Sequence, residues 1–199
     1  MISLEDGIQG LDLWKNFNAN FKKIVPGSRN QNMPQELSEC LSILIARQIP
    51  RYESLVWSKG VKNVSGDAHI PASRVCVSTK SLKTKVKLHI KPDENTMTRV
   101  EIKCFTSDGP ISFGPKEAWD VLLILDACDY IGYNFALYEI PMKNDSSEWS
   151  VLQLNKSQTF AHQCEEGRRP RLSFSELRAQ LGQNCKLLWS GDIRDLLKK

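Results

Sequence analysis

The sequence predicts an α/β domain in which two N-terminal helices precede a core built on a β-hairpin. Three observations predict this class. Apolar residues recur every three or four positions in the first fifty residues, apolar and charged residues alternate between residues 85 and 105, and an unbroken apolar run occupies residues 121–125. The chain of 199 residues can bury a substantial core and shows no linker, repeat or low-complexity tract. We therefore predict a single domain over residues 1–199, mainly helical over 1–50.

Two amphipathic helices are predicted in the first quarter of the chain. The apolar residues from Leu11 to Ile24 follow one another at steps of three and four, which is the spacing of one helix face. Pro34 suits the first turn of a second helix, which must end near Pro50. The apolar stripe of this second helix includes Leu37, Leu41, Leu44 and Ile45.

The next predicted feature is an antiparallel hairpin. Apolar and basic residues alternate strictly over residues 85–91, and a second alternating segment covers residues 99–105. Residues 92–95 between them are typical of a turn. The apolar residues of both strands are expected to face the core.

Four further elements are predicted in the second half. Residues 116–120 favour a short helix, and the apolar run 121–125 is typical of a buried central strand. Residues 134–140 are predicted to form a neighbouring strand. A helix begins at Ser173, because Glu176 three residues later completes a capping box.

Composition excludes several classes of protein. No apolar run approaches the ~20 residues that span a bilayer, and the first residues lack the pattern of a secretory signal. Six cysteines without a C-x-x-C pair favour free thiols over a zinc site or a disulfide scaffold. We therefore expect a cytoplasmic protein with no membrane segment. The net charge of +4 is too small to predict nucleic-acid binding by itself.

One short motif places two charged groups on the same side of a predicted strand. In Glu101-Ile102-Lys103 the outer two side chains share a face, since side chains two apart on a strand point the same way. It is the only Glu/Asp-x-Lys triplet in the chain. An exposed ion pair, of little energetic value, is the alternative interpretation.

A second acid precedes the strand region. Asp67 follows Gly66, and a glycine there allows a sharp turn that brings the carboxylate toward the hairpin. Two carboxylates can hold Mg²⁺, and a lysine beside them can assist attack on a phosphoryl group. A plain turn aspartate is the alternative.

These residues carry a family resemblance. Gly66-Asp67 followed by Glu101-Ile102-Lys103 resembles the signature of the PD-(D/E)XK nucleases, and the segment 112–120 is similar to one that follows the catalytic lysine in some type II restriction endonucleases. The resemblance covers residues 65–171 and implies a mixed central β-sheet flanked by helices. Two departures are the glycine in place of proline before the first acid and the long spacing of the two acids.

The resemblance also implies roles for the site residues. Asp67 and Glu101 would bind Mg²⁺, with the carbonyl of Ile102 as a third ligand, and Lys103 would orient or activate the water. The chain also contains a literal Pro-Asp pair ending at Asp93, which we rank below Asp67 because it lies at the predicted hairpin turn.

Helix glutamates assist metal binding in some such nucleases. Glu36 or Glu39 of the second predicted helix is the candidate here, although a solvated helix face is the favoured interpretation for both.

Basic and polar residues near these elements are candidates for DNA contacts. An arginine can pair bidentately with guanine, and lysines or a helix start can bind phosphates. A solvated basic surface is the alternative. The candidates are Lys85, Lys87, Ser112, Lys116, Arg168, Arg169 and Arg171.

The resemblance predicts a Mg²⁺-dependent, sequence-specific endodeoxyribonuclease that hydrolyses phosphodiester bonds in double-stranded DNA. A homodimer is expected because one site cuts one strand of a short, symmetric target. A companion DNA methyltransferase acting on the same site is consistent with this interpretation. The alternatives are a repair or structure-selective nuclease of the same fold and a non-catalytic DNA-binding or adaptor protein.

Overall fold

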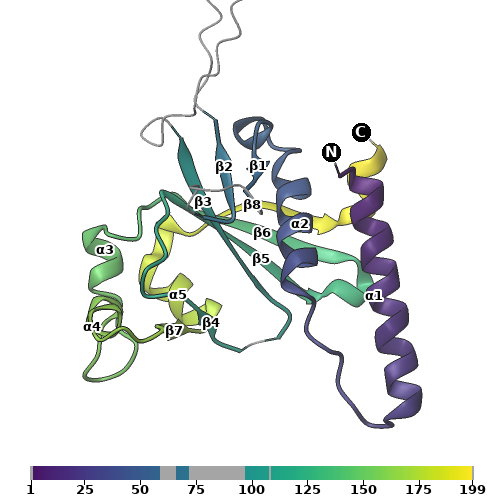
Figure 1. Cartoon of the computed structure of the whole chain (residues 1–199), viewed down its shortest axis with the longest axis horizontal. Helices are drawn as coiled ribbons and strands as arrows, with labels where there is room; N and C mark the ends of the chain where they lie inside the picture. Colours follow the sequence, from purple (N-terminus) through teal and green to yellow (C-terminus); the bar gives the residue numbers. More distant parts are fainter. Residues whose placement is uncertain (1, 59–65, 72–96, 108, 199) are drawn as a thin grey trace, which may run out of the picture.

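A mixed six-stranded β-sheet lies between two layers in the computed structural model, which describes residues 2–58, 66–71, 97–107 and 109–198 (Figure 1). The strands follow the order β1-β2-β3-β5-β6-β8 across the sheet. Their bounds are β1 Val56–Trp57, β2 Ala68–Ile70, β3 Thr98–Phe105, β5 Val121–Asp129, β6 Asn134–Ile140 and β8 Lys186–Asp192. The predicted α/β class is confirmed.

β3 makes the sheet mixed, because it pairs in parallel with one neighbouring strand and antiparallel with the other. β3 pairs in parallel with β5, with Ile102 opposite Leu123, whereas the other neighbouring strands pair antiparallel. The predicted strand at 99–105 is confirmed as β3. Its described antiparallel partner is β2, which pairs with residues 98–100. The other arm of the predicted hairpin, residues 85–91, lies outside the described residues.

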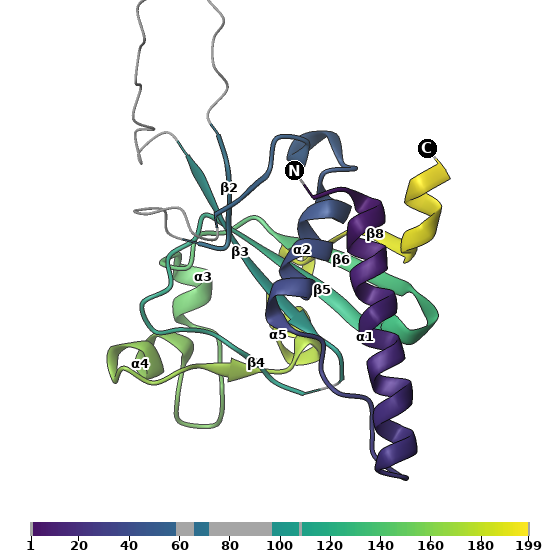
Figure 2. The ribbon, with the colours of Figure 1, turned by 45° about the vertical axis from the view of Figure 1, so that its right-hand side comes forward.

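Helices α1 (Leu4–Ile24) and α2 (Gln35–Ala46) cover one face of the sheet (Figure 2). α1 begins seven residues before the predicted start, at a capping box formed by Ser3 and Asp6. The sequence does not predict this start, because Gly7 and Gly10 lie in the first turns and glycine disfavours helices. At Gly7 α2 nevertheless packs so closely that a Cβ there would lie 2.5 Å from Leu44 Cδ1.

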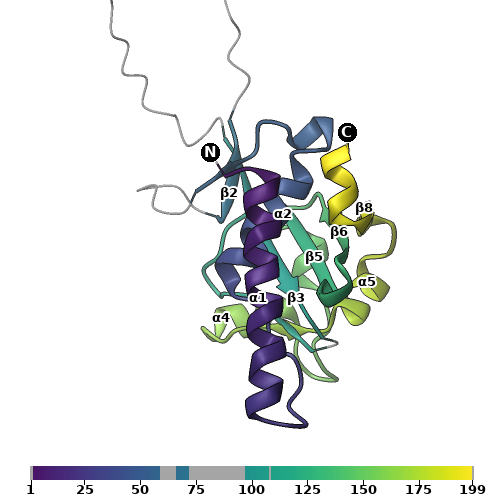
Figure 3. The ribbon, with the colours of Figure 1, turned by 90° about the vertical axis from the view of Figure 1, so that its right-hand side faces the viewer.

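The predicted apolar face of α1 is only partly a core face. Leu11 is fully buried, but Phe17 and Ile24 are 47% and 78% exposed. The buried face is formed instead by the N-terminal half, and the C-terminal half extends past the sheet (Figure 3). The spacing correctly predicts a helix but not which of its residues meet the core.

The other face of the sheet carries a second layer of short elements. They are β4 Ile111–Ser112, which pairs with β7 Arg171–Leu172, and the helices α3 Ser147–Ser150, α4 Phe160–Glu165 and α5 Phe174–Leu181. Their core is a cluster of four buried aromatic rings, with centroids 5.1–6.0 Å apart for the pairs in contact. These rings belong to Phe113, Trp119, Trp149 and Phe160.

Most predictions for the second half are confirmed. The apolar run 121–125 lies inside β5, residues 134–140 form β6, and Ser173 and Glu176 form the capping box of α5. The helix predicted at 116–120 is wrong. The turn at residues 115–116 is followed by residues without regular secondary structure, and Trp119 among them is anchored in the aromatic cluster.

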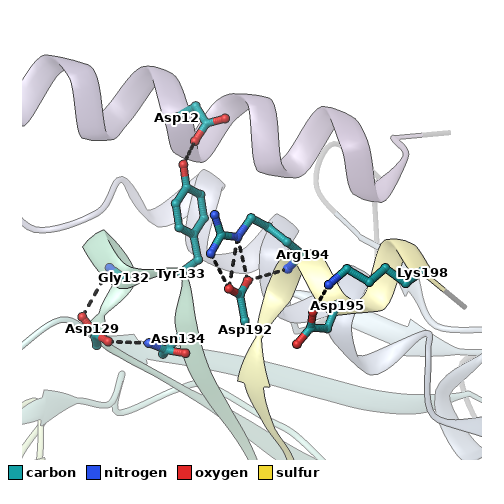
Figure 4. A network of polar contacts seen from close by, with 9 residues as sticks. All are labelled: Asp12, Asp129, Gly132, Tyr133, Asn134, Asp192, Arg194, Asp195 and Lys198. Atoms are coloured by element: carbon teal, nitrogen blue, oxygen red, sulfur yellow. Dashed lines mark hydrogen bonds and ion pairs between the residues drawn. The ribbon is translucent and has the colours of Figure 1, made fainter.

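The C-terminal residues close the core against α1. Four 3₁₀ segments complete the described elements: η1 Pro50–Tyr52, η3 Tyr130–Gly132, η4 Gly182–Asn184 and η5 Ile193–Lys198. Ile193 and Leu196 of η5 are buried in the core that α1 covers. Figure 4 shows Tyr133 at the β5–β6 connection hydrogen-bonded to Asp12 of α1, with Arg194 beside its ring. No helix among the described residues combines the length and apolar character needed to cross a bilayer.

Asp120, the residue before β5, binds Arg99 of β3. Its replacement is expected to make the free energy of unfolding less dependent on pH. Its carboxylate accepts hydrogen bonds from the Arg99 backbone N–H at 2.8 Å and from the Arg99 guanidinium at 3.0 and 3.1 Å. These bonds lower the pKa of Asp120, so their stabilisation is present above the ordinary aspartate pKa and is lost as pH falls through the lowered value.

For Asp120→Asn we expect a loss of about 1 kcal/mol at pH 7, discounted for the part-exposed arginine. The difference from the unsubstituted protein should shrink as pH falls below about 4, the ordinary aspartate pKa, and through the lowered pKa of the folded carboxyl. Urea unfolding at several pH values measures this. A difference that stays constant down to pH 3 would contradict it.

Candidate active site

The candidate site lies at an edge of β3 that the described strands leave open. β2 pairs with residues 98–100 of β3, and no described strand pairs with residues 101–105 on that side. The backbone N–H of Ile102 instead donates to Asp67 Oδ2 at 2.9 Å. A carboxylate therefore takes the place of a neighbouring strand at the centre of β3.

Gly66 allows the backbone to place Asp67 next to β3. Its φ of +89° lies in the left-handed region that side chains rarely adopt, and a Cβ there would lie 3.1 Å from the Val100 carbonyl oxygen. Both the backbone turn and the close approach to β3 require a glycine. The sharp turn predicted from Gly66-Asp67 is present.

Glu101 and Lys103 lie on the same face of β3 and form a buried ion pair. Lys103 Nζ is 2.6 Å from Glu101 Oε1, and their side chains are only 16% and 6% exposed. The exposed ion pair considered above is therefore wrong. The pair faces the second layer, where Lys103 Nζ lies 5.9 Å from the centroid of the Phe113 ring.

Glu117 is a site residue that the sequence did not reveal. Its Oε2 lies 3.1 Å from Lys103 Nζ, so the ammonium sits between two carboxylates. The side chain folds back over Gly114, where a Cβ would lie 2.6 Å from Glu117 Oε1. The available signal was an acid three residues after a glycine, in a segment interpreted as a helix.

Glu39 of α2 brings a further carboxylate toward Asp67. It is 5% exposed, and its two oxygens accept hydrogen bonds from Trp57 Nε1 at 3.1 Å and Gln35 Nε2 at 2.7 Å. The solvated-face interpretation is therefore wrong for Glu39, whereas Glu36 is exposed. Asp93 lies outside the described residues.

The site concentrates negative charge in a buried place. Burial raises the pKa of Glu101 to about 7, against the lowering effect of Lys103, and Asp67 and Glu117 raise it further. Burial also raises the pKa of Asp67, and Glu39 and Glu117 contribute to the rise.

Lys103 remains a cation in these surroundings. Burial lowers its pKa, but Glu101 and Glu117 more than offset this and raise it above the ordinary value. One ammonium thus faces several carboxylates, and their charge is only partly neutralised.

This donor set fits a hard divalent cation. Asp67 and Glu101 supply carboxylate oxygens, and the Ile102 carbonyl faces the Asp67 edge because the N–H and C=O of one strand residue point to the same side. Within the described ranges, no three His, Cys, Asp or Glu side chains gather closely enough to hold a metal alone. Mg²⁺ commonly needs only one or two carboxylates and keeps several waters.

A cleft of about 590 Å³ runs along this edge, between α2 and the β4 segment. Glu39, Lys103 and Glu117 lie in its wall, together with two predicted DNA contacts, Ser112 and Arg169. The cleft is therefore continuous from the buried charges to the basic loop at 167–171.

The other predicted DNA contacts lie apart from the cleft wall or outside the described residues. Lys116 is exposed in the turn after Gly114, and Arg171 is exposed on β7 opposite Ser112. Arg168 is exposed and pairs with Glu166 at 3.2 Å. Lys85 and Lys87 lie outside the described residues.

Comparison with known proteins identifies a family. The family model described as Bsp6I restriction endonuclease matches residues 3–177, which include Asp67, Glu101 and Lys103. No curated protein and no solved structure matches the chain.

Proposed function

The chain belongs to the Bsp6I restriction endonuclease family, and from this premise we propose that it is a Mg²⁺-dependent type II endodeoxyribonuclease. It would hydrolyse phosphodiester bonds in double-stranded DNA at a short recognised sequence. The observation that carries the proposal is the buried Lys103 held between Glu101 and Glu117, next to the Asp67 carboxylate that accepts from the backbone of β3. A structural ion pair needs only one partner, so the surplus of carboxylates favours a cation-dependent site.

Asp67 and Glu101 would hold Mg²⁺, with the Ile102 carbonyl as a further oxygen ligand. When bound, the ion supplies an acidified water and stabilises charge on a phosphoryl group. The Lys103 ammonium would orient the attacking water and donate hydrogen bonds to the non-bridging oxygen that gains charge. Glu117 would act as a positioning residue, because its oxygen is a second carboxylate partner of the ammonium beside Glu101.

The cleft offers a path for DNA from this site toward the second layer. Arg169 and Ser112 lie in the cleft wall, and Lys116, Arg168 and Arg171 are exposed on neighbouring segments. Lys85 and Lys87 remain proposed DNA contacts from the sequence. We include in the proposal a homodimer, since each site would cut one strand, and a companion methyltransferase that protects the host sequence.

Digestion of several plasmids with the purified protein tests the proposed function. With Mg²⁺ we expect discrete fragments, and with EDTA no cleavage, because the carboxylates alone do not supply an acidified water. Restoring activity by excess Mg²⁺ after EDTA excludes damage to the protein.

Three outcomes would contradict the proposal. A smear of fragments would favour the repair or structure-selective nuclease. DNA binding without cleavage in Mg²⁺ would favour the non-catalytic DNA-binding or adaptor protein. Discrete cleavage in EDTA would show that the reaction does not need Mg²⁺.

A further inference from the structure

A second cavity adjoins the cleft of the candidate site. It has a volume of about 750 Å³ and lies beside the C-terminal half of α1. It shares Asn32, Thr106 and Ser107 with the cleft that contains Lys103, so the two form a continuous surface at the end of β3. Its remaining lining residues are Trp14, Phe17, Phe21, Arg29, Asn30 and Gln31.

We call this second cavity the groove. Its lining differs in charge from that of the cleft. The groove contains one arginine, amides, hydroxyls and aromatic rings, and none of its lining residues is acidic. Arg29 is exposed and forms no ion pair with any carboxylate of the described residues. Lys22 and Lys23, in the last turn of α1, add further positive charge at this end. An anionic ligand suits this composition.

The polar wall of the groove is held in place by a buried asparagine. Asn18 is 2% exposed, and its Oδ1 accepts from the Gln31 backbone N–H at 2.6 Å while its Nδ2 donates to the Trp14 carbonyl at 3.0 Å. The Tyr130 hydroxyl donates to the Gln31 carbonyl at 3.0 Å. The backbone of this extended segment is therefore fixed from both sides, although it has no regular secondary structure.

Asn32 links the groove to the cleft. Its Oδ1 accepts from Thr106 Oγ1 at 2.9 Å, which leaves the amide NH₂ group for a ligand. Asn30 and Arg29 are exposed on the same fixed segment. Donors on a rigid segment next to a reactive site are typical of positioning contacts to a phosphate backbone.

The α1 residues in the lining of this groove are aromatic. Trp14, Phe17 and Phe21 stack in a row along α1, with ring centroids 4.9 and 6.1 Å apart. Phe17 is nearly half exposed although it lies beside these rings. Apolar side chains of this kind pack against sugars or enter the minor groove in proteins that bind duplex DNA.

We propose that this groove binds the DNA duplex that flanks the cleavage site, with Arg29 on a phosphate, the Asn32 amide beside it and Phe17 against the sugars. The inference rests on the proposed function. It assigns to α1 and the segment that follows it a DNA-contacting surface outside the cleft and its basic loop. Continuity with the cleft and the absence of acids favour DNA over a second copy of the chain as the occupant.

Arg29→Ala tests the proposal in the full-length chain. Binding to a duplex that contains the cleaved sequence is measured by fluorescence anisotropy at several salt concentrations, in a Glu101→Gln background that prevents cleavage. We expect affinity to fall by about threefold to tenfold and the dependence of log Kd on log salt to decrease by about one unit, as for one lost phosphate contact. Asn32→Ala should also weaken binding, and Lys186→Ala, an exposed cation on β8, should not.

Sedimentation of the Arg29→Ala and Phe17→Ala chains identifies the occupant. Unchanged mass together with the reduced salt dependence supports the proposal. A halved mass for either variant would assign the groove to a second copy and overturn it, as would an unchanged salt dependence in Arg29→Ala. If the unsubstituted chain cuts DNA while Arg29→Ala and Asn32→Ala bind normally, only this inference fails. If it neither binds nor cuts DNA, the proposed function fails.

Discussion

Lys103→Ala is expected to lower the rate of DNA cleavage by about a hundredfold to a thousandfold, the cost of removing one preorganised donor to a developing oxyanion. The ammonium is 2.6 Å from Glu101 and 3.1 Å from Glu117, and no other lysine of the described residues shares this position. The fold should survive the substitution, because Glu101 already has a pKa of about 7 and can take up a proton when its partner is lost.

Plasmid cleavage over time measures this loss, and Lys186→Ala serves as the matched control because that lysine is exposed on β8. Lys103→Arg should also be strongly impaired, since a planar guanidinium does not replace a compact ammonium between two carboxylates. Glu101→Gln, with Glu53→Gln as its exposed control, should lose activity for a different reason, the loss of a metal ligand. Equal cleavage by Lys103→Ala and the unsubstituted chain would refute the site assignment.

Phe113→Ala should have the largest effect on stability, a loss of about 3–5 kcal/mol in the free energy of unfolding. The ring is fully buried and contacts Trp119, Trp149 and Phe160. Truncation would leave a cavity in the second layer and loosen the segment that carries Glu117. Phe113→Leu, which keeps most of the volume, should lose much less.

Urea unfolding compares the two Phe113 variants, and Phe17→Ala is the control for removal of an exposed ring. Cleavage by Phe113→Ala, measured where the protein remains folded, should also fall, because Glu117 positions Lys103 from this segment. A stability loss no larger than that of Phe17→Ala would show that the aromatic cluster does not hold the second layer.

The sequence predicted those parts of the fold and site that depend on local spacing. Strand alternation placed Glu101 and Lys103 on one face of β3, and the glycine before Asp67 indicated a turn that is present. The capping box of α5 is likewise local.

The missed features depend on tertiary packing. Glu117 lies in a turn whose path is set by buried Trp119, and Glu39 is buried because Trp57 of β1 donates to it. The parallel pairing of β3 with β5 was not predictable either. A helix is the usual mark of such a crossover, and the described residues between β3 and β5 contain none.

The packing of η5 against α1 affects when the fold can be completed during synthesis. Leu4 and Ile8 of the first helix share a core with Ile193 and Leu196 of η5. At ribosomal rates, roughly 10 to 40 s separate the first of these residues from the last. A nascent chain therefore lacks the finished scaffold behind β3 until these last residues have been made.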